Sequence, residues 1–111
     1  MNKSIRFNFK KLISLIIIAF FLWSVGAMYI TYHETIHQNI FTHYNIKSNI
    51  SIHYFKLSGT TTPTSYDNCT ESCLSSHELN DIVGYYLAVF IYFTIILVFI
   101  IFLLKKNEEG K

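Results

Sequence analysis

Proline and charged residues are scarce in this chain. There is one proline in 111 residues, and charged residues make up 14% of the sequence against 51% hydrophobic residues. Two long blocks, residues 12–32 and 82–104, contain neither charge nor proline. Their apolar residues do not alternate with polar ones, so a helix formed by either block would have no face suited to water. This composition argues against a soluble core and favours a lipid environment.

Each block is long enough to cross a membrane. About 20 helical residues span a hydrocarbon core roughly 30 Å thick, and in lipid a lone segment satisfies its backbone hydrogen bonds only as a helix. The sequence therefore predicts an all-α membrane protein, a two-transmembrane antiparallel helical hairpin with spans at 12–32 and 82–104. The first helix is expected to continue out of the membrane to about Tyr44, because no proline interrupts it.

The basic residues predict the orientation of the hairpin. Four precede the first block, three follow the second and two lie between: Lys3, Arg6, Lys10, Lys11; Lys105, Lys106, Lys111; Lys47, Lys56. Lysine and arginine stay on the cytoplasmic side, so 1–11 and 105–111 are predicted to be cytoplasmic and the loop 33–81 extracytoplasmic. The net charge of +2 follows from this distribution and does not indicate nucleic-acid binding. Alternatively, residues 1–27 are a cleaved signal peptide, which would leave one span.

The loop between the blocks contains several local patterns. In residues 45–55 isoleucine and tyrosine alternate with polar residues, which predicts a short strand or hairpin. Residues 58–68 are rich in turn formers and hold the single proline, so a flexible loop is expected there. Ser75 and Glu78 have capping-box spacing, which predicts that the second helix begins near Ser76.

The sharpest motif is His33-Glu34-Thr35-Ile36-His37, directly after the first block. On a helix, His33 and His37 lie one turn apart on the same face, and two imidazoles so placed can bind zinc at about 2.0–2.1 Å. Glu34 can then take a proton from a water whose pKa the metal lowers. A plainer interpretation stays open, in which both histidines hydrogen-bond to water and lipid headgroups.

This pentapeptide resembles the active-site helix of zincin (HExxH) zinc metallopeptidases. The resemblance covers the motif and its uncharged flanks, and it departs from the family at Asn39, which is polar where a hydrophobic residue is usual. It implies that His33 and His37 bind zinc and that Glu34 is the general base. Zincin sites often have an edge strand beside the metal helix, so residues 45–55 are expected to bind extended substrate by strand addition.

A catalytic zinc needs a third protein ligand and an open position for water. In an antiparallel hairpin the second helix begins at the depth of His33, which makes Asp81 the first candidate ligand and His77 the second. Zincins often use an acidic residue after an asparagine, and Asp81 with its preceding asparagine is similar. Gly84 and Ala88 extend this face with small residues that allow close helix approach. Without a metal, Asp81 would still interact favourably with a helix N-terminus.

The two cysteines, Cys69 and Cys73, lie in the outward loop. An oxidising exterior favours a disulfide between them; the alternative is metal binding together with His77. His43 and His53 are expected on the surface. Three further polar residues are candidates to hydrogen-bond the metal ligands: Asn80, Tyr85 and Tyr32.

The leading hypothesis is a membrane-bound metallopeptidase that hydrolyses peptide bonds with zinc-activated water at the outer membrane surface. Its cofactor would be Zn²⁺, and its partners the lipid bilayer and a peptide or protein substrate. Since soluble zincins use far more chain to build a cleft, a second copy or another membrane protein is expected to help complete one. The alternatives are a non-enzymatic two-span protein (holin-like, toxin or accessory subunit) and a structural zinc-binding module.

Overall fold

The structure is a computed structural model that describes residues 8–110. It consists of two long helices with two strands between them in the chain: α1 (Phe9–His43), β1 (Ser48–His53), β2 (Ser58–Pro63) and α2 (Glu71–Glu109). The described chain is therefore mostly helical, as the sequence predicts, with a small sheet added. Lys3, Arg6 and Lys111, used above to predict orientation, lie outside the described residues, as does the start of the alternative signal peptide.

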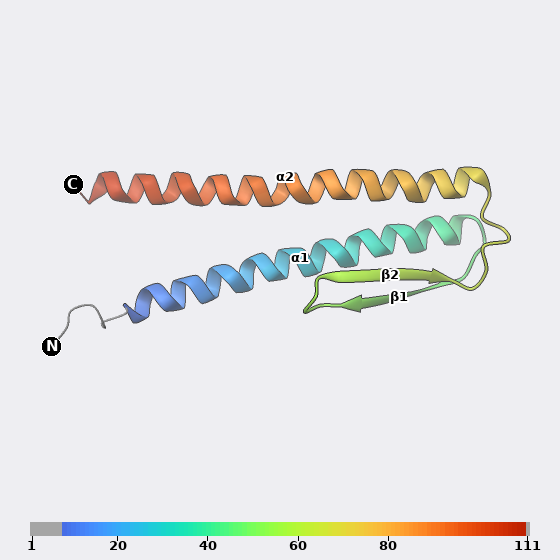
Figure 1. The fold of residues 1–111 in the computed structure, drawn as a ribbon, viewed down its shortest axis with the longest axis horizontal. Helices are drawn as coiled ribbons and strands as arrows, with labels where there is room; N and C mark the ends of the chain where they lie inside the picture. The colour runs from blue at the N-terminus through green and yellow to red at the C-terminus, as the bar shows by residue number, and fades with distance from the viewer. Residues whose placement is uncertain (1–7, 111) are drawn as a thin grey trace.

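The two helices lie side by side and antiparallel, so the start of α1 and the end of α2 share one end of the molecule (Figure 1). The molecule is elongated, at 70 × 27 × 15 Å. Both helices are long and apolar enough to cross a membrane, and only 6% of the apolar window of α1 and 0% of that of α2 is buried inside the protein. The apolar side chains therefore face outward and do not form an internal core.

The serine and threonine hydroxyls within the apolar segments are satisfied locally. The hydroxyls of Ser24, Thr31 and Thr94 donate to backbone carbonyls four residues earlier, at 2.8 Å each. This back-bonding leaves no hydroxyl donor of these residues in need of water. α1 continues without interruption to His43, close to the expected end at Tyr44.

The strands form one antiparallel hairpin, in which Ile50 pairs with Thr61 and Ile52 with Gly59. β1 lies within the segment 45–55, as predicted. The expectation of a flexible loop over 58–68 is wrong for its first half, which is β2. The less exposed face of β2 has no large apolar residue, so it lacks the alternation that reveals β1; its members are Gly59, Thr61 and Pro63.

The hairpin folds back along α1 toward the apolar half of the molecule (Figure 1). The indole Nε1 of Trp23 donates to the Tyr54 carbonyl at 2.9 Å. A Cβ at Gly26 would lie 2.9 Å from Leu57 Cδ1, and one at Gly59 would lie 2.8 Å from Glu34 Cγ. Two glycines, one on each element, therefore allow the hairpin and α1 to touch.

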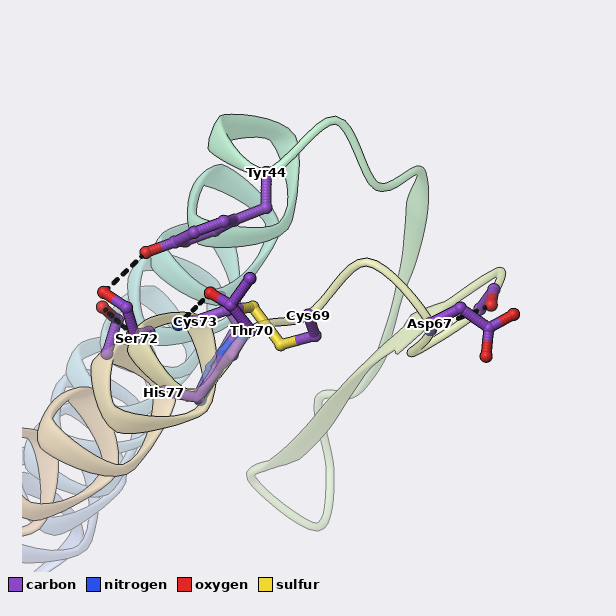
Figure 2. Close-up of a disulfide and its surroundings, with 10 residues drawn as sticks. Tyr44, Asp67, Cys69, Thr70, Ser72, Cys73 and His77 are labelled. Carbon is purple, nitrogen blue, oxygen red and sulfur yellow. Dashed lines mark hydrogen bonds between the residues drawn. A yellow bond between two sulfur atoms is a disulfide. The ribbon is translucent and has the colours of Figure 1, made fainter.

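A disulfide closes the end of the molecule where α2 begins (Figure 2). Cys69 and Cys73 are bonded as expected, and Cys73 is fully buried. The Thr70 hydroxyl accepts from the Cys73 backbone N–H at 3.3 Å and caps the helix. The prediction of a start near Ser76 is wrong, because threonine at the N-cap satisfies an amide that would otherwise lack a partner.

The small core lies at this same end. Its buried members are Phe41, Ile46 and Cys73. The Tyr44 hydroxyl donates to Ser72 Oγ at 3.0 Å, which joins the end of α1 to the start of α2 (Figure 2). The core and these links fix the ends of the two helices beside each other, one to three turns from the histidines of the motif.

Candidate metal centre

Two histidines of α1 and one aspartate of α2 bring their side chains together. The Nε2 atoms of His33 and His37 are 3.2 Å apart. Asp81 Oδ1 lies 3.2 Å from His33 Nε2 and 2.8 Å from His37 Nε2. The residue predicted first as the third ligand is therefore beside the pair, and three donor atoms form a compact triangle.

This triangle fits a zinc ion. Ligand atoms at 2.0–2.1 Å from a tetrahedral zinc lie about 3.3 Å from one another, and the three observed separations are 2.8, 3.2 and 3.2 Å. Electron-pair donors at such separations repel unless a proton or cation lies between them. The imidazoles are 20% and 13% exposed and the Asp81 side chain 62%, so the site opens to solvent on the side of Asp81.

His77 was the second candidate for the third ligand, and it is placed elsewhere. Its Nδ1 lies 2.6 Å from Nδ1 of His37, the nitrogen of His37 that does not face Asp81. The two rings stack with centroids 4.9 Å apart. His77 is therefore placed as a hydrogen-bond partner of His37 and is not among the three converging donors.

This contact has a consequence for the protonation of His37. If Nε2 of His37 binds a metal, its Nδ1 carries the proton and donates to Nδ1 of His77, and such a partner fixes the ring's tautomer and orientation. Burial lowers the pKa of His77, the neighbouring His37 lowers it further, and Asp81 opposes the shift. A lowered pKa favours the neutral imidazole, which is the form able to accept this hydrogen bond.

Glu34 lies between α1 and the hairpin, and it is only 7% exposed. The Thr61 hydroxyl donates to its Oε2 at 2.6 Å. Its carboxylate is not part of the triangle of donors, yet Glu34 lines the same cavity as His33, His37 and Asp81. Glu34 therefore borders the cavity without belonging to the three converging donors.

Two residues of β2 that contact Glu34, Gly59 and Thr61, were not predicted from the sequence. The available signal was weak: three consecutive threonines, a residue type that favours strands, in a segment otherwise rich in turn formers. β2 lines the cavity at the site and β1 does not, so the strand beside the three donors is β2 and not the strand predicted over residues 45–55.

The start of α2 supports the histidines from the other side. A Cβ at Gly84 would lie 2.7 Å from His33 Nδ1, so the predicted small-residue contact is present. Asn80 Nδ2 donates to the His33 carbonyl at 3.3 Å, and the Tyr29 hydroxyl donates to the Gly84 carbonyl. Tyr32 and Tyr85 are 63% and 69% exposed, and among residues 8–110 neither hydrogen-bonds a ligand side chain.

A second group of metal-binding residue types consists of Cys69, Cys73 and His77, whose ligand atoms lie within 4.8 Å of one another. In the disulfide the two sulfurs are bonded to each other and are not the thiolates that bind metals. This group could serve as a site only in a reduced chain. His43 and His53 are exposed and belong to neither group.

Comparison with protein-family models, with curated proteins and with solved structures finds no match to this chain. The pentapeptide and the geometry around it are therefore the basis for assigning a function.

Proposed function

We propose that the protein is a membrane-bound zinc metallopeptidase, with His33, His37 and Asp81 as zinc ligands and Glu34 as general base. One observation carries this proposal. An oxygen atom from a residue 48 positions along the chain lies 3.2 Å from His33 Nε2 and 2.8 Å from His37 Nε2. If the pentapeptide had arisen by chance, a third donor from another helix would not be expected beside its two histidines.

Each side chain has a defined task in this proposal. Zinc, when bound, would polarise the substrate carbonyl and lower the pKa of a coordinated water. Glu34 would accept a proton from that water and pass it to the amine released when the peptide C–N bond breaks. Because the Thr61 hydroxyl donates a hydrogen bond to Oε2 of Glu34, Oε1 is the atom that would take the proton. The Thr61 contact would hold this carboxylate in place before substrate binds.

Membrane insertion is part of the same proposal. A helix of 39 residues whose apolar window is 0% buried needs an apolar surrounding, and among the described residues the protein supplies none. The lysines at the shared end of the helices, Lys10, Lys11, Lys105 and Lys106, would remain cytoplasmic. The loop and the metal centre would then face outward. A reporter fused after Lys111 should read as cytoplasmic, and one inserted at Ser65 as extracytoplasmic.

The decisive experiment compares two carboxylate-to-amide substitutions in purified protein. Glu34→Gln should retain one zinc per chain and lose hydrolysis of fluorescent casein by about 100-fold or more, because a positioned base contributes at least that factor. Glu78→Gln is the matched control, since Glu78 is exposed on α2 and should leave both quantities unchanged. Equal hydrolysis by the wild type and Glu34→Gln would refute the assignment.

The second candidate is a non-enzymatic two-span protein in which the cluster only joins the helices. The favouring observation is that one Asp81 oxygen reaches both imidazoles, so protonated histidines could form an ion-pair network without metal. This candidate predicts no stoichiometric zinc. A structural zinc module, by contrast, predicts bound zinc and no effect of Glu34→Gln on any phenotype.

A further inference from the structure

We infer that the substrate of the proposed peptidase is the membrane-adjacent segment of another membrane protein, bound in extended form with one end outside the bilayer and the other entering it. This inference rests on the proposed function and goes beyond it by naming the substrate class. It is carried by the shape and chemistry of the space beside the metal centre.

Two open cavities adjoin at the metal centre, because both are lined by His33, Glu34, Gly59 and Asp81. The outer cavity, of about 450 Å³, extends to Phe41, Tyr66, Leu74 and His77. The inner cavity, of about 250 Å³, extends to Tyr29, Ile30, Tyr85 and Ala88. Together they form one groove, which we call the substrate groove, with the metal centre near its middle.

The substrate groove follows the long axis of the helices. α1 forms its floor, and β2 and α2 form its walls. Its α1 residues run from Phe41 to Tyr29, a rise of about 18 Å at 1.5 Å per residue. An extended peptide covers that distance with about five or six residues. A substrate lying in the groove would therefore be parallel to the two helices.

The groove crosses the expected membrane boundary. Its outer lining belongs to residues outside the apolar blocks, whereas Tyr29, Ile30 and Ala88 lie within 12–32 and 82–104. Its outer half mixes polar side chains, Thr60, Thr61 and His77, with apolar ones, Phe41, Tyr66 and Leu74, whereas its inner half adds only tyrosine, aliphatic and glycine residues. An occupant that fills both halves must be able to hydrogen-bond in the outer half and to enter lipid at the inner end.

The hairpin gives an independent reason for such an occupant. The sheet has two strands, so one edge of β2 lacks a strand partner among the described residues. Three consecutive residues of β2, Gly59, Thr60 and Thr61, line the outer cavity. The backbone N–H and C=O groups on the free edge of β2 could therefore pair with an extended substrate.

The test uses the full-length protein in proteoliposomes with two substrate pools. One pool is a randomised octapeptide fused to a transmembrane helix in the same vesicles, and the other is the same octapeptide without the helix. We expect the tethered pool to be cleaved at least tenfold faster, with the cuts clustered at a fixed distance from the helix. Cleavage sites are read by mass spectrometry.

Because tethering alone raises local concentration, a variant pair separates that effect from groove binding. Ala88→Phe would fill the inner half of the groove, whereas Val89→Phe adds the same ring at a neighbouring residue that is 52% exposed. Ala88→Phe should slow cleavage of the tethered pool about tenfold without changing zinc content. Val89→Phe should change none of these.

Two results would overturn the inference while leaving the peptidase assignment standing: equal cleavage of both pools, or equal behaviour of the two phenylalanine variants. Cleavage of neither pool by zinc-loaded protein would instead overturn the proposed function, and the inference with it.

Discussion

The two ends of this molecule are built in different ways. The half that holds the hairpin, the disulfide and the candidate metal centre, here called the outer half, is joined by directional contacts between α1, β2 and α2. In the inner half α1 diverges from α2 (Figure 1). Between them there lies a wholly apolar cavity of about 460 Å³, lined by Phe21, Thr94, Ile95, Val98, Phe99 and Phe102. The contrast indicates that residue identity is tightly constrained in the outer half, whereas the inner half requires mainly length and apolarity.

The largest expected effect in the outer half comes from removing a ligand. His37→Ala should weaken zinc binding by more than about 100-fold, which exceeds the usual loss from removing a partner of a ligand. Zinc competition in detergent measures the change. His43→Ala, an exposed histidine on the same helix, should bind zinc as the wild type does. Equal zinc affinity in both variants would exclude His37 as a ligand.

Removing His77, the hydrogen-bond partner of His37, should have a smaller effect on zinc affinity. His77→Leu cannot accept the proton on His37 Nδ1, so zinc affinity should fall about 10- to 100-fold. His77→Gln keeps an acceptor and should recover much of this loss. If His77 were itself a ligand, His77→Gln would bind zinc no better than His77→Leu. Nitrogen NMR would then show the same His37 tautomer in the wild type and in both variants.

Close packing between the helices gives a third, milder prediction. The added methyl of Gly84→Ala would lie 2.7 Å from His33 Nδ1, so the ring must shift, and we expect zinc affinity to fall by about tenfold or less. Gly110→Ala is the control, because its methyl would meet nothing closer than 3.6 Å. An unchanged affinity for Gly84→Ala would show that His33 need not occupy this position.

The inner half should show almost no effect. Phe102→Leu changes the lining of the apolar cavity but keeps the side chain suited to lipid, so zinc affinity should change less than about twofold, as for distant, independent sites. A loss comparable to that of Gly84→Ala would mean that inner packing determines the geometry of the metal centre, and the contrast between the two halves would fail.

The features that could be predicted from sequence are those with a strong local signal. Two uncharged blocks predict the two long helices, and the His33–His37 spacing places both imidazoles on one face. Asp81 could be found because an antiparallel hairpin brings the start of α2 to the depth of His33. The helices and the histidine pair follow from helix geometry alone, whereas Asp81 also required the antiparallel arrangement of the helices and the resemblance to zincins.

The remainder depends on contacts between elements that no local pattern encodes. β2 is stabilised by pairing with β1 and by the fit of Gly59 against Glu34, and its own sequence resembles a loop. The start of α2 is set by Thr70 and the adjoining disulfide, five residues before a capping pattern that is not used. The role of His77 depends on which nitrogen of His37 faces Asp81, and only the three-dimensional structure shows this.

The most direct test is the X-ray absorption spectrum of zinc in the oxidised, purified protein. With His33, His37 and Asp81 as ligands, we expect one zinc per chain with nitrogen and oxygen neighbours at about 2.0–2.1 Å, including two imidazoles, and no sulfur. A sulfur shell at about 2.3 Å would place the metal at Cys69 and Cys73, and an absence of bound zinc would remove the metal centre altogether. Either result would contradict the assignment of His33, His37 and Asp81 as the ligands.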